Sequence, residues 1–222
     1  MSDGDMQLIE QRTVRVPAGR QSLEGELIVP ARARGIVLFA HGSGSSRFSS
    51  RNKYVAAMLH ESGFATLLMD LLTPNEEQLD RLSGEFRFDI GRLAARLVEA
   101  SAWLEADRAT ASLPLSIFGA STGGGAALVA AAELPNRVAA VVSRGGRPDL
   151  AGDALERVAA PTLLIVGGND EVVLELNRTA LERLRAPARL EVIPGATHLF
   201  EEPGALDEVA RHASAWFEAY AG

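Results

Sequence analysis

The sequence has 222 residues, of which 47% are hydrophobic and 23% charged, proportions that argue against wholesale disorder. The chain has 22 Lys and Arg residues and 29 Asp and Glu residues, which gives a net charge of −7. We therefore do not expect a nucleic-acid-binding surface. There is no cysteine, which excludes disulfides, a thiolate nucleophile and cysteine-ligated metals.

The start of the sequence shows no targeting pattern. Residues 1–17 are polar and acidic, and they lack the positive start and apolar run of a signal peptide. No stretch approaches the roughly 20 apolar residues that a membrane helix needs. We therefore expect a soluble, cytoplasmic protein without a membrane partner.

The first half alternates between strand and helix patterns. Residues 12–17 and 22–30 predict two hairpin-like strands. The uninterrupted apolar run 35–40 is typical of a strand buried on both faces of a parallel sheet. The pattern then predicts a helix at 52–62, a strand at 64–70, a polar loop, and a helix at 89–106 that Asp89 caps.

The second half repeats strand and helix four times. Such alternation indicates βαβ units, and hence an α/β fold with a mostly parallel sheet of about eight strands and helices on both faces. No linker interrupts it, so we expect a single domain spanning 1–222, with functional residues beyond the carboxyl ends of the strands. The predicted strands are 113–118, 138–143, 162–167 and 189–193, and the helices are 122–133, 151–159, 174–185 and 203–220.

A candidate nucleophile follows the fifth strand. Residues 119–123 read GASTG, the form G-x-S-x-G, between a buried strand and a helix rich in small residues. The small neighbours allow Ser121 to occupy a strained turn, and the helix N-terminus favours an anion formed there. A glycine-rich turn with an incidental serine remains an alternative.

The glycine-rich turn of short-chain dehydrogenases is a second alternative, and three features argue against it. The turn lies past the middle of the chain, and the following strand ends in Ser143-Arg144-Gly145-Gly146 without an acid for a ribose. The tyrosines Tyr54 and Tyr220 lack a lysine four positions later.

A base and an acid follow in the chain. His198 lies between the last strand and the last helix, and Asp170 follows the strand at 162–167. Serine needs a base to take its proton, and the base needs an acid to orient it. The order Ser121, Asp170, His198 is that of α/β-hydrolases. Competing acids are Asp149, Glu171 and Asp70.

Two backbone N–H groups are candidates for an oxyanion hole. One belongs to Thr122, directly after the candidate nucleophile, and the other to Ser43, in the loop after the strand at 35–40. We interpret the neighbouring His41 as a residue that orders this loop.

With these motifs in place, the chain resembles the α/β-hydrolase family, in particular its small dienelactone-hydrolase-like members. The resemblance implies an eight-stranded sheet and hydrolysis of a carboxylic ester through an acyl-enzyme on Ser121, with no cofactor and no metal. Dienelactone hydrolases proper use a cysteine nucleophile, so a serine esterase is the favoured activity. The matching segments are FAHGSG (39–44), GASTG (119–123), GGNDE (167–171) and GATHLF (195–200).

A further expectation concerns the substrate, which we expect to be a small acyl compound. The segment 144–161 is too short for a large cap, which predicts an open site with substrate contacts from short loops. A catalytically idle binding protein on the same fold is the alternative function.

Four arginines follow strand ends at the expected site edge, and one or more of them could anchor an anionic group on the substrate. Arg144 is the favoured anchor because it follows its strand most directly. The alternative is local salt bridges to Asp149, Asp70 or Glu76. The four residues are Arg47, Arg51, Arg144 and Arg147.

Overall fold

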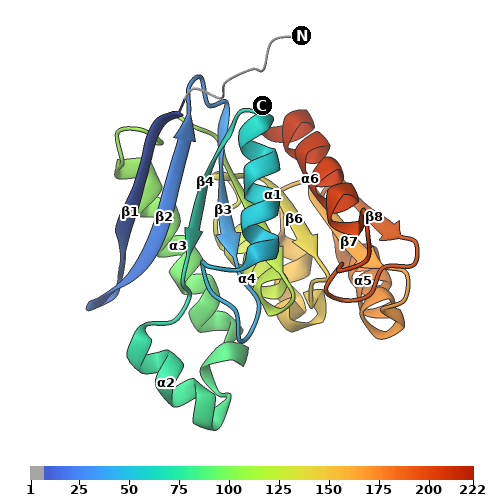
Figure 1. The fold of residues 1–222 in the computed structure, drawn as a ribbon. Helices are drawn as coiled ribbons and strands as arrows, with labels where there is room; N and C mark the ends of the chain where they lie inside the picture. The colour runs from blue at the N-terminus through green and yellow to red at the C-terminus, as the bar shows by residue number, and fades with distance from the viewer. Residues whose placement is uncertain (1–7) are drawn as a thin grey trace.

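A computed structural model describes residues 8–222, and a single eight-stranded sheet runs through them (Figure 1). The strand order is β1-β2-β4-β3-β5-β6-β7-β8. The predicted α/β-hydrolase fold is therefore confirmed. The strands are β1 (Leu8–Ala18), β2 (Gln21–Pro30), β3 (Gly35–Ala40), β4 (Phe64–Met69), β5 (Leu115–Ala120), β6 (Val138–Arg144), β7 (Thr162–Gly167) and β8 (Ala188–Ile193).

The first two strands form an antiparallel hairpin, as their sequence predicts, and β2 pairs antiparallel with β4. Among themselves, the strands from β3 to β8 pair only in parallel. Every residue of β3, β4, β5 and β7 is buried, which explains their uninterrupted apolar runs.

Helices cover both faces of the sheet (Figure 1). Alternate residues of β3 point to opposite faces, so Leu38 and Phe39 belong to two different apolar cores. Among residues 8–222, no helix combines the length and apolarity needed to cross a membrane. One face carries α1 (Ser50–Glu61) and α6 (Ala205–Ala221), and the other carries α3 (Ile90–Ala106), α4 (Thr122–Glu133), α5 (Glu171–Arg183) and the 3-10 helix η2 (Pro148–Arg157).

The predicted boundaries differ from the observed ones by a few residues. The helix expected at 174–185 begins earlier, at Glu171. The helix expected at 151–159 is the 3-10 helix η2, which is kinked at Gly152 with φ of 53°. Asp89 caps α3 as expected, because its side chain accepts a hydrogen bond from the N–H of Arg92 at 3.0 Å.

The polar loop expected after β4 is a wrong prediction. This segment contains the helix α2 (Pro74–Ser83) and a 3-10 turn at Phe86–Phe88. Thr73 and Glu76 form a reciprocal capping box at the start of α2, and Gly84 ends it with a left-handed φ of 69°. These are sequence-readable signals, but the helix is polar, and its two leucines, Leu79 and Leu82, are exposed. It projects from the edge where the parallel strands end (Figure 1).

Removing the cap should destabilise this segment. In Thr73→Ala, the N–H of Glu76 loses its acceptor at 3.3 Å, and we expect the free energy of unfolding to fall by about 1 kcal/mol. Urea titration followed by circular dichroism measures the change. Gln78→Ala, at an exposed position of the same helix, is the control. Equal stability of Thr73→Ala and the control would contradict the capping role.

Candidate active site

Ser121 occupies a sharp turn between β5 and α4. Its φ of 52° and ψ of −123° are strained for a residue with a Cβ atom. A Cβ on Gly119 would lie 2.5 Å from the carbonyl oxygen of Gly123, and a Cβ on Gly123 would lie 2.2 Å from that of Ala40. Glycine is required at both positions because the backbones of β3, β5 and α4 approach so closely. This geometry is that of a nucleophile elbow.

His198 and Asp170 complete a chain of hydrogen bonds with this serine. The Nε2 atom of His198 lies 3.3 Å from the Oγ atom of Ser121, and its Nδ1 atom lies 2.6 Å from Oδ2 of Asp170. Because a carboxylate only accepts, Nδ1 carries the proton, and the lone pair of Nε2 faces the serine hydroxyl. Asp170 precedes α5 but makes no capping bond, so its carboxylate remains available to His198.

Backbone hydrogen bonds join the loop of Asp170 to the loop of His198. The N–H of Gly168 donates to the carbonyl of Ile193 at 2.8 Å, and the N–H of Asn169 donates to that of Ala196 at 2.9 Å. The side-chain amide of Asn169 donates to the carbonyl of Gly195 at 2.9 Å. Asp170 and His198 therefore lie on two loops that hydrogen bonds hold together.

The competing acids have other partners or positions. Asp149 accepts two hydrogen bonds from Arg147, at 2.8 and 2.7 Å. Asp70 forms an ion pair with Arg47. Glu171 is exposed on the first turn of α5. Asp170 is the acid that contacts His198.

The loop after β3, residues 41–46, carries the candidate donor Ser43 and is called here the oxyanion loop. It packs directly on the turn that holds Ser121. A Cβ on Gly42 would lie 3.0 Å from the Cβ of Ser121. The N–H of Ser43 donates to the hydroxyl of Thr122 at 2.8 Å, a contact that sequence reasoning did not predict. The N–H of Thr122 opens helix α4, where the first-turn donors have no partner within the helix. The two candidate donors thus lie on adjoining segments beside Ser121.

His41 fixes the orientation of this loop. Its Nε2 atom accepts from the N–H of Leu71 at 3.0 Å, so Nδ1 carries the proton and donates to the carbonyl of Gly42 at 2.9 Å. Burial lowers the pKa of His41, which favours this neutral form. In a trans peptide the N–H opposes the carbonyl, so holding the Gly42 carbonyl also aims the N–H of Ser43.

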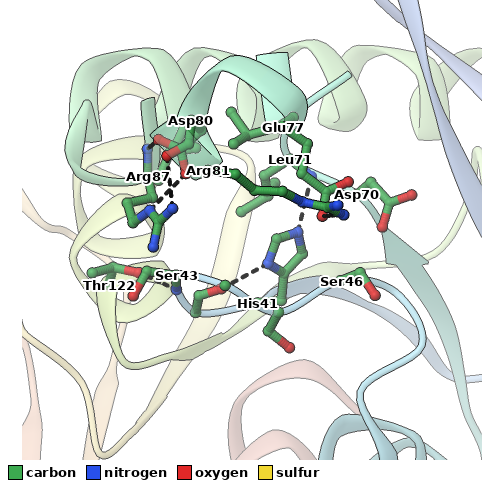
Figure 2. Close-up of a pocket in the computed structure, with 15 residues that line it drawn as sticks. His41, Ser43, Ser46, Asp70, Leu71, Glu77, Asp80, Arg81, Arg87 and Thr122 are labelled. Carbon is green, nitrogen blue, oxygen red and sulfur yellow. Dashed lines mark hydrogen bonds and ion pairs between the residues drawn. The ribbon is translucent and has the colours of Figure 1, made fainter. Parts of the chain in front are cut away.

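Two cavities meet at the oxyanion loop. One, of about 250 Å³, is lined by Ser121 and His198 and is called here the catalytic cavity. The other, of about 260 Å³, lies beneath α2 and is called here the α2 cavity (Figure 2). Gly42, Ser43 and Ser45 line both, so the loop that offers an oxyanion donor separates them.

The α2 cavity is built partly by the segment that was expected to be a loop. Figure 2 shows Asp80 and Arg87 on the side of this cavity that faces Ser43 and Thr122. Asp80 is buried and accepts from the Nε of Arg87 at 2.6 Å and from its backbone N–H at 2.9 Å. Helix α2 therefore walls one side of this cavity, and the expectation that short loops supply the substrate contacts stays a prediction.

The four arginines proposed as anion anchors divide into two groups. Arg47 pairs with Asp70 and with Glu24, and Arg147 pairs with Asp149, so local acids already neutralise both. The salt-bridge alternative describes these two residues and also Arg51, which pairs with Glu201 at 3.2 Å. Arg51 and Arg144 line the catalytic cavity together with Ser121. Glu76 pairs instead with Arg92 and Arg96.

Comparison with known proteins agrees with this geometry. The model of the dienelactone hydrolase family matches residues 23–221. The chain belongs to the dienelactone hydrolase family. A crystal structure of a dienelactone hydrolase from Anabaena variabilis is 58% identical, with a TM-score of 0.95 over 97% of this chain and 100% of that one. Est1E from Butyrivibrio proteoclasticus shares the fold at 16% identity, with a TM-score of 0.77 over 93% of this chain and 98% of that chain. The family match supports a hydrolase.

A curated relative from Mycobacterium tuberculosis carries a different name. It is called "Putative phosphoribosyl transferase", and it is 59% identical over 94% of this chain. The aligned region is 46% of that relative, so the chain spans about half the length of the curated relatives it matches. Within residues 8–222, no three His, Asp or Glu side chains are arranged to hold a metal ion.

The orientation of the oxyanion loop should depend on His41. In His41→Gln we expect the reaction of Ser121 with a fluorophosphonate probe to slow roughly tenfold, because a misaimed donor stabilises the anionic transition state less. Gel fluorescence over time measures the rate. His60→Gln is the matched control. The side chain of His60 is also buried, and among residues 8–222 it hydrogen-bonds only to the hydroxyl of Thr66, at 2.7 Å. Equal slowing in both variants would contradict the role of His41.

Proposed function

We propose that the chain is a serine hydrolase that cleaves carboxylic esters of small molecules through an acyl-enzyme on Ser121. The observation that carries this proposal is the hydrogen-bonded chain from Ser121 to His198 to Asp170, with distances of 3.3 and 2.6 Å. The family membership supports a hydrolase, and the serine at the elbow supports acyl transfer.

In the first half of the reaction, Ser121 attacks the ester carbonyl. Its proton passes to Nε2 of His198, and Asp170 stabilises the imidazolium that results. The carbonyl oxygen becomes an anion that the N–H groups of Thr122 and Ser43 stabilise, the latter by exchanging the Thr122 hydroxyl for the substrate. His198 then gives its proton to the leaving alcohol oxygen.

In the second half, water replaces the alcohol. His198 takes a proton from that water, which attacks the acyl group on Ser121 and passes through a second oxyanion. The ester bond to Ser121 breaks, and the proton returns to its Oγ atom. The carboxylic acid leaves and the free serine is restored. Every proton transfer uses His198, so the proposed chemistry requires only groups that the chain supplies.

The alternatives differ in what Ser121 does. An idle binding protein on the same fold, or a dehydrogenase, has no activated serine, so a fluorophosphonate probe would not label it. Covalent labelling of Ser121, located by peptide mass spectrometry, therefore separates the hydrolase from the two alternatives. The transferase name of the curated relatives belongs to proteins about twice as long, and the site geometry offers no observation that favours that activity here.

The catalytic trio should be indispensable. We expect Ser121→Ala and His198→Ala each to abolish turnover of p-nitrophenyl acetate, because one missing member disables the unit. Asp170→Asn should lower kcat by about 10³-fold or more through the wrong histidine tautomer. Asp149→Asn is the matched control. A crippled Asp149→Asn beside an active Asp170→Asn would show that the acid is misassigned.

The acyl preference should follow the size of the site. The α2 cavity of about 260 Å³ is bounded by α2 and the oxyanion loop, so we expect acetate and butyrate esters to be hydrolysed faster than long-chain esters. A series of p-nitrophenyl esters of increasing acyl length measures kcat/KM. A clear preference for acyl chains of ten or more carbons would contradict this assignment.

A further inference from the structure

The catalytic cavity contains a buried cation, and no acid among residues 8–222 pairs with it. Arg144 is 8% exposed and lines the cavity together with Ser121 and His198. Its Nη2 atom donates to Oδ1 of Asn52 over a long 3.4 Å, and its Nη1 atom has no hydrogen-bond partner among the described residues. The backbone fixes it beside the nucleophile, because the N–H of Ser121 donates to the carbonyl of Arg144 at 3.1 Å.

A buried guanidinium without an acidic partner is costly, and the ring of Phe200, whose centroid lies 6.0 Å from Cζ of Arg144, does not supply a counter-charge. Burying a charge without a counter-charge loses hydration that a neutral amide does not replace. Burial, together with the nearby charge of Arg51, lowers the pKa of Arg144 to about 10. The group is still protonated at neutral pH. The cavity therefore holds a positive charge with a free donor at the place where substrate binds.

The start of α1 adds to the same positive site. Ser49 caps this helix of 12 residues, and its first turn contains no acidic residue to offset the partial positive charge of the free N–H groups. Ser49, Arg51 and Asn52 all line the catalytic cavity. Arg51 pairs with Glu201 at 3.2 Å, but the Glu201 side chain is 66% exposed, so this surface pair is weak and an anion can displace it.

The position of His198 relative to the two cavities indicates which cavity binds the alcohol of the ester and which binds the acyl group. His198 must reach the leaving oxygen to protonate it, and His198 lines the catalytic cavity. The leaving alcohol therefore extends into the catalytic cavity, toward Arg144 and the start of α1. The acyl group extends past the oxyanion loop, toward Thr122 and the α2 cavity. The α2 cavity has no excess of positive charge, because three acids and two arginines line it: Asp70, Glu77, Asp80, Arg81 and Arg87.

We propose that Arg144, Arg51 and the N-terminus of α1 form a subsite for an anionic group on the leaving alcohol. The substrate is then the acyl ester of an alcohol that carries a carboxylate or a phosphate. This inference rests on the proposed hydrolase function and specifies its substrate. Reaction of such an ester releases an anionic alcohol and a small carboxylic acid, so an acyl transfer to that alcohol must supply the substrate.

Four esters test the position of the charge. The first, 3-carboxyphenyl acetate, carries a carboxylate on the alcohol, and its methyl ester is the neutral match. The phosphate of 3-hydroxyphenyl acetate carries a phosphate at the same position. Monophenyl succinate carries its carboxylate on the acyl side. We expect the wild-type kcat/KM to be at least tenfold higher for one or both alcohol-side anions than for the neutral ester, and the larger value identifies the anion.

Variants then assign the preference to residues. We expect Arg144→Gln to lower kcat/KM for the preferred anionic ester about 30-fold, mainly through KM, and Arg51→Gln to lower it about fivefold, since charged hydrogen bonds are lost. In both variants, the ratio of kcat/KM for the anionic ester to kcat/KM for the neutral ester should fall. Arg144→Lys should retain part of the preference. Arg178→Gln is the matched control, because Arg178 also pairs with an exposed acid, Glu175, but on α5.

Several outcomes would overturn the subsite. These are equal losses for charged and neutral esters in Arg144→Gln, a wild-type preference for monophenyl succinate, or no preference among the four. If Arg144→Gln fails to fold, Arg51→Gln and the wild-type comparison decide.

Failure of the hydrolase itself is recognised separately, by absent turnover of every ester and no probe labelling of Ser121. In that case calorimetric titration of the wild type and of Arg51→Gln with 3-hydroxybenzoate and inorganic phosphate tests the subsite alone. Weaker binding to Arg51→Gln supports the subsite, and equal or absent binding overturns it.

Discussion

The close approach of three backbones around Ser121 is the constraint on which the rest of the site depends. A Cβ on Gly123 would lie 2.2 Å from the carbonyl oxygen of Ala40. Helix α4 can therefore begin this close to β3 only because residue 123 has no Cβ atom. That proximity brings the loop after β3 onto the nucleophile turn, with Gly42 against Ser121. The strained φ of Ser121, 52°, follows from the same tight turn. One steric condition therefore positions both the nucleophile and the loop that carries a candidate oxyanion donor.

Hydrogen bonds between neighbouring strand ends hold the remaining groups. The loops after β7 and β8 are linked through Gly168 and Asn169, which keeps Asp170 within 2.6 Å of His198. The end of β4 is linked to the oxyanion loop through His41. Each reactive group thus sits on a short loop whose backbone is tied to an adjacent strand, and little conformational entropy remains to be lost when substrate binds.

The sequence allowed prediction of features that depend on local pattern and on strand order. Buried strands such as 35–40 and the glycines around Ser121 have strong signatures, and the carboxyl ends of parallel strands meet at one edge, which predicted the meeting of Ser121, Asp170 and His198. Helix α2 was missed because it is polar, although Thr73, Glu76 and Gly84 carry capping signals. The pairing of Arg47 with Asp70 and the lack of a partner for Arg144 Nη1 depend on side-chain geometry, which a linear pattern does not encode.

Positive charge is distributed unequally between the two cavities of the candidate site. The chain carries a net charge of −7, but interactions between exposed charges fade beyond about 8 Å at physiological ionic strength, so the surface excess does not cancel a buried cation. In the α2 cavity, Arg87 is matched by the buried Asp80, whereas in the catalytic cavity Arg144 has no acidic partner within the described residues. The proposed subsite would therefore attract an ester with one anionic end in a single orientation. In the proposed mechanism, that orientation is also the one in which His198 can protonate the leaving oxygen, so the same charge asymmetry that favours binding would favour a productive arrangement.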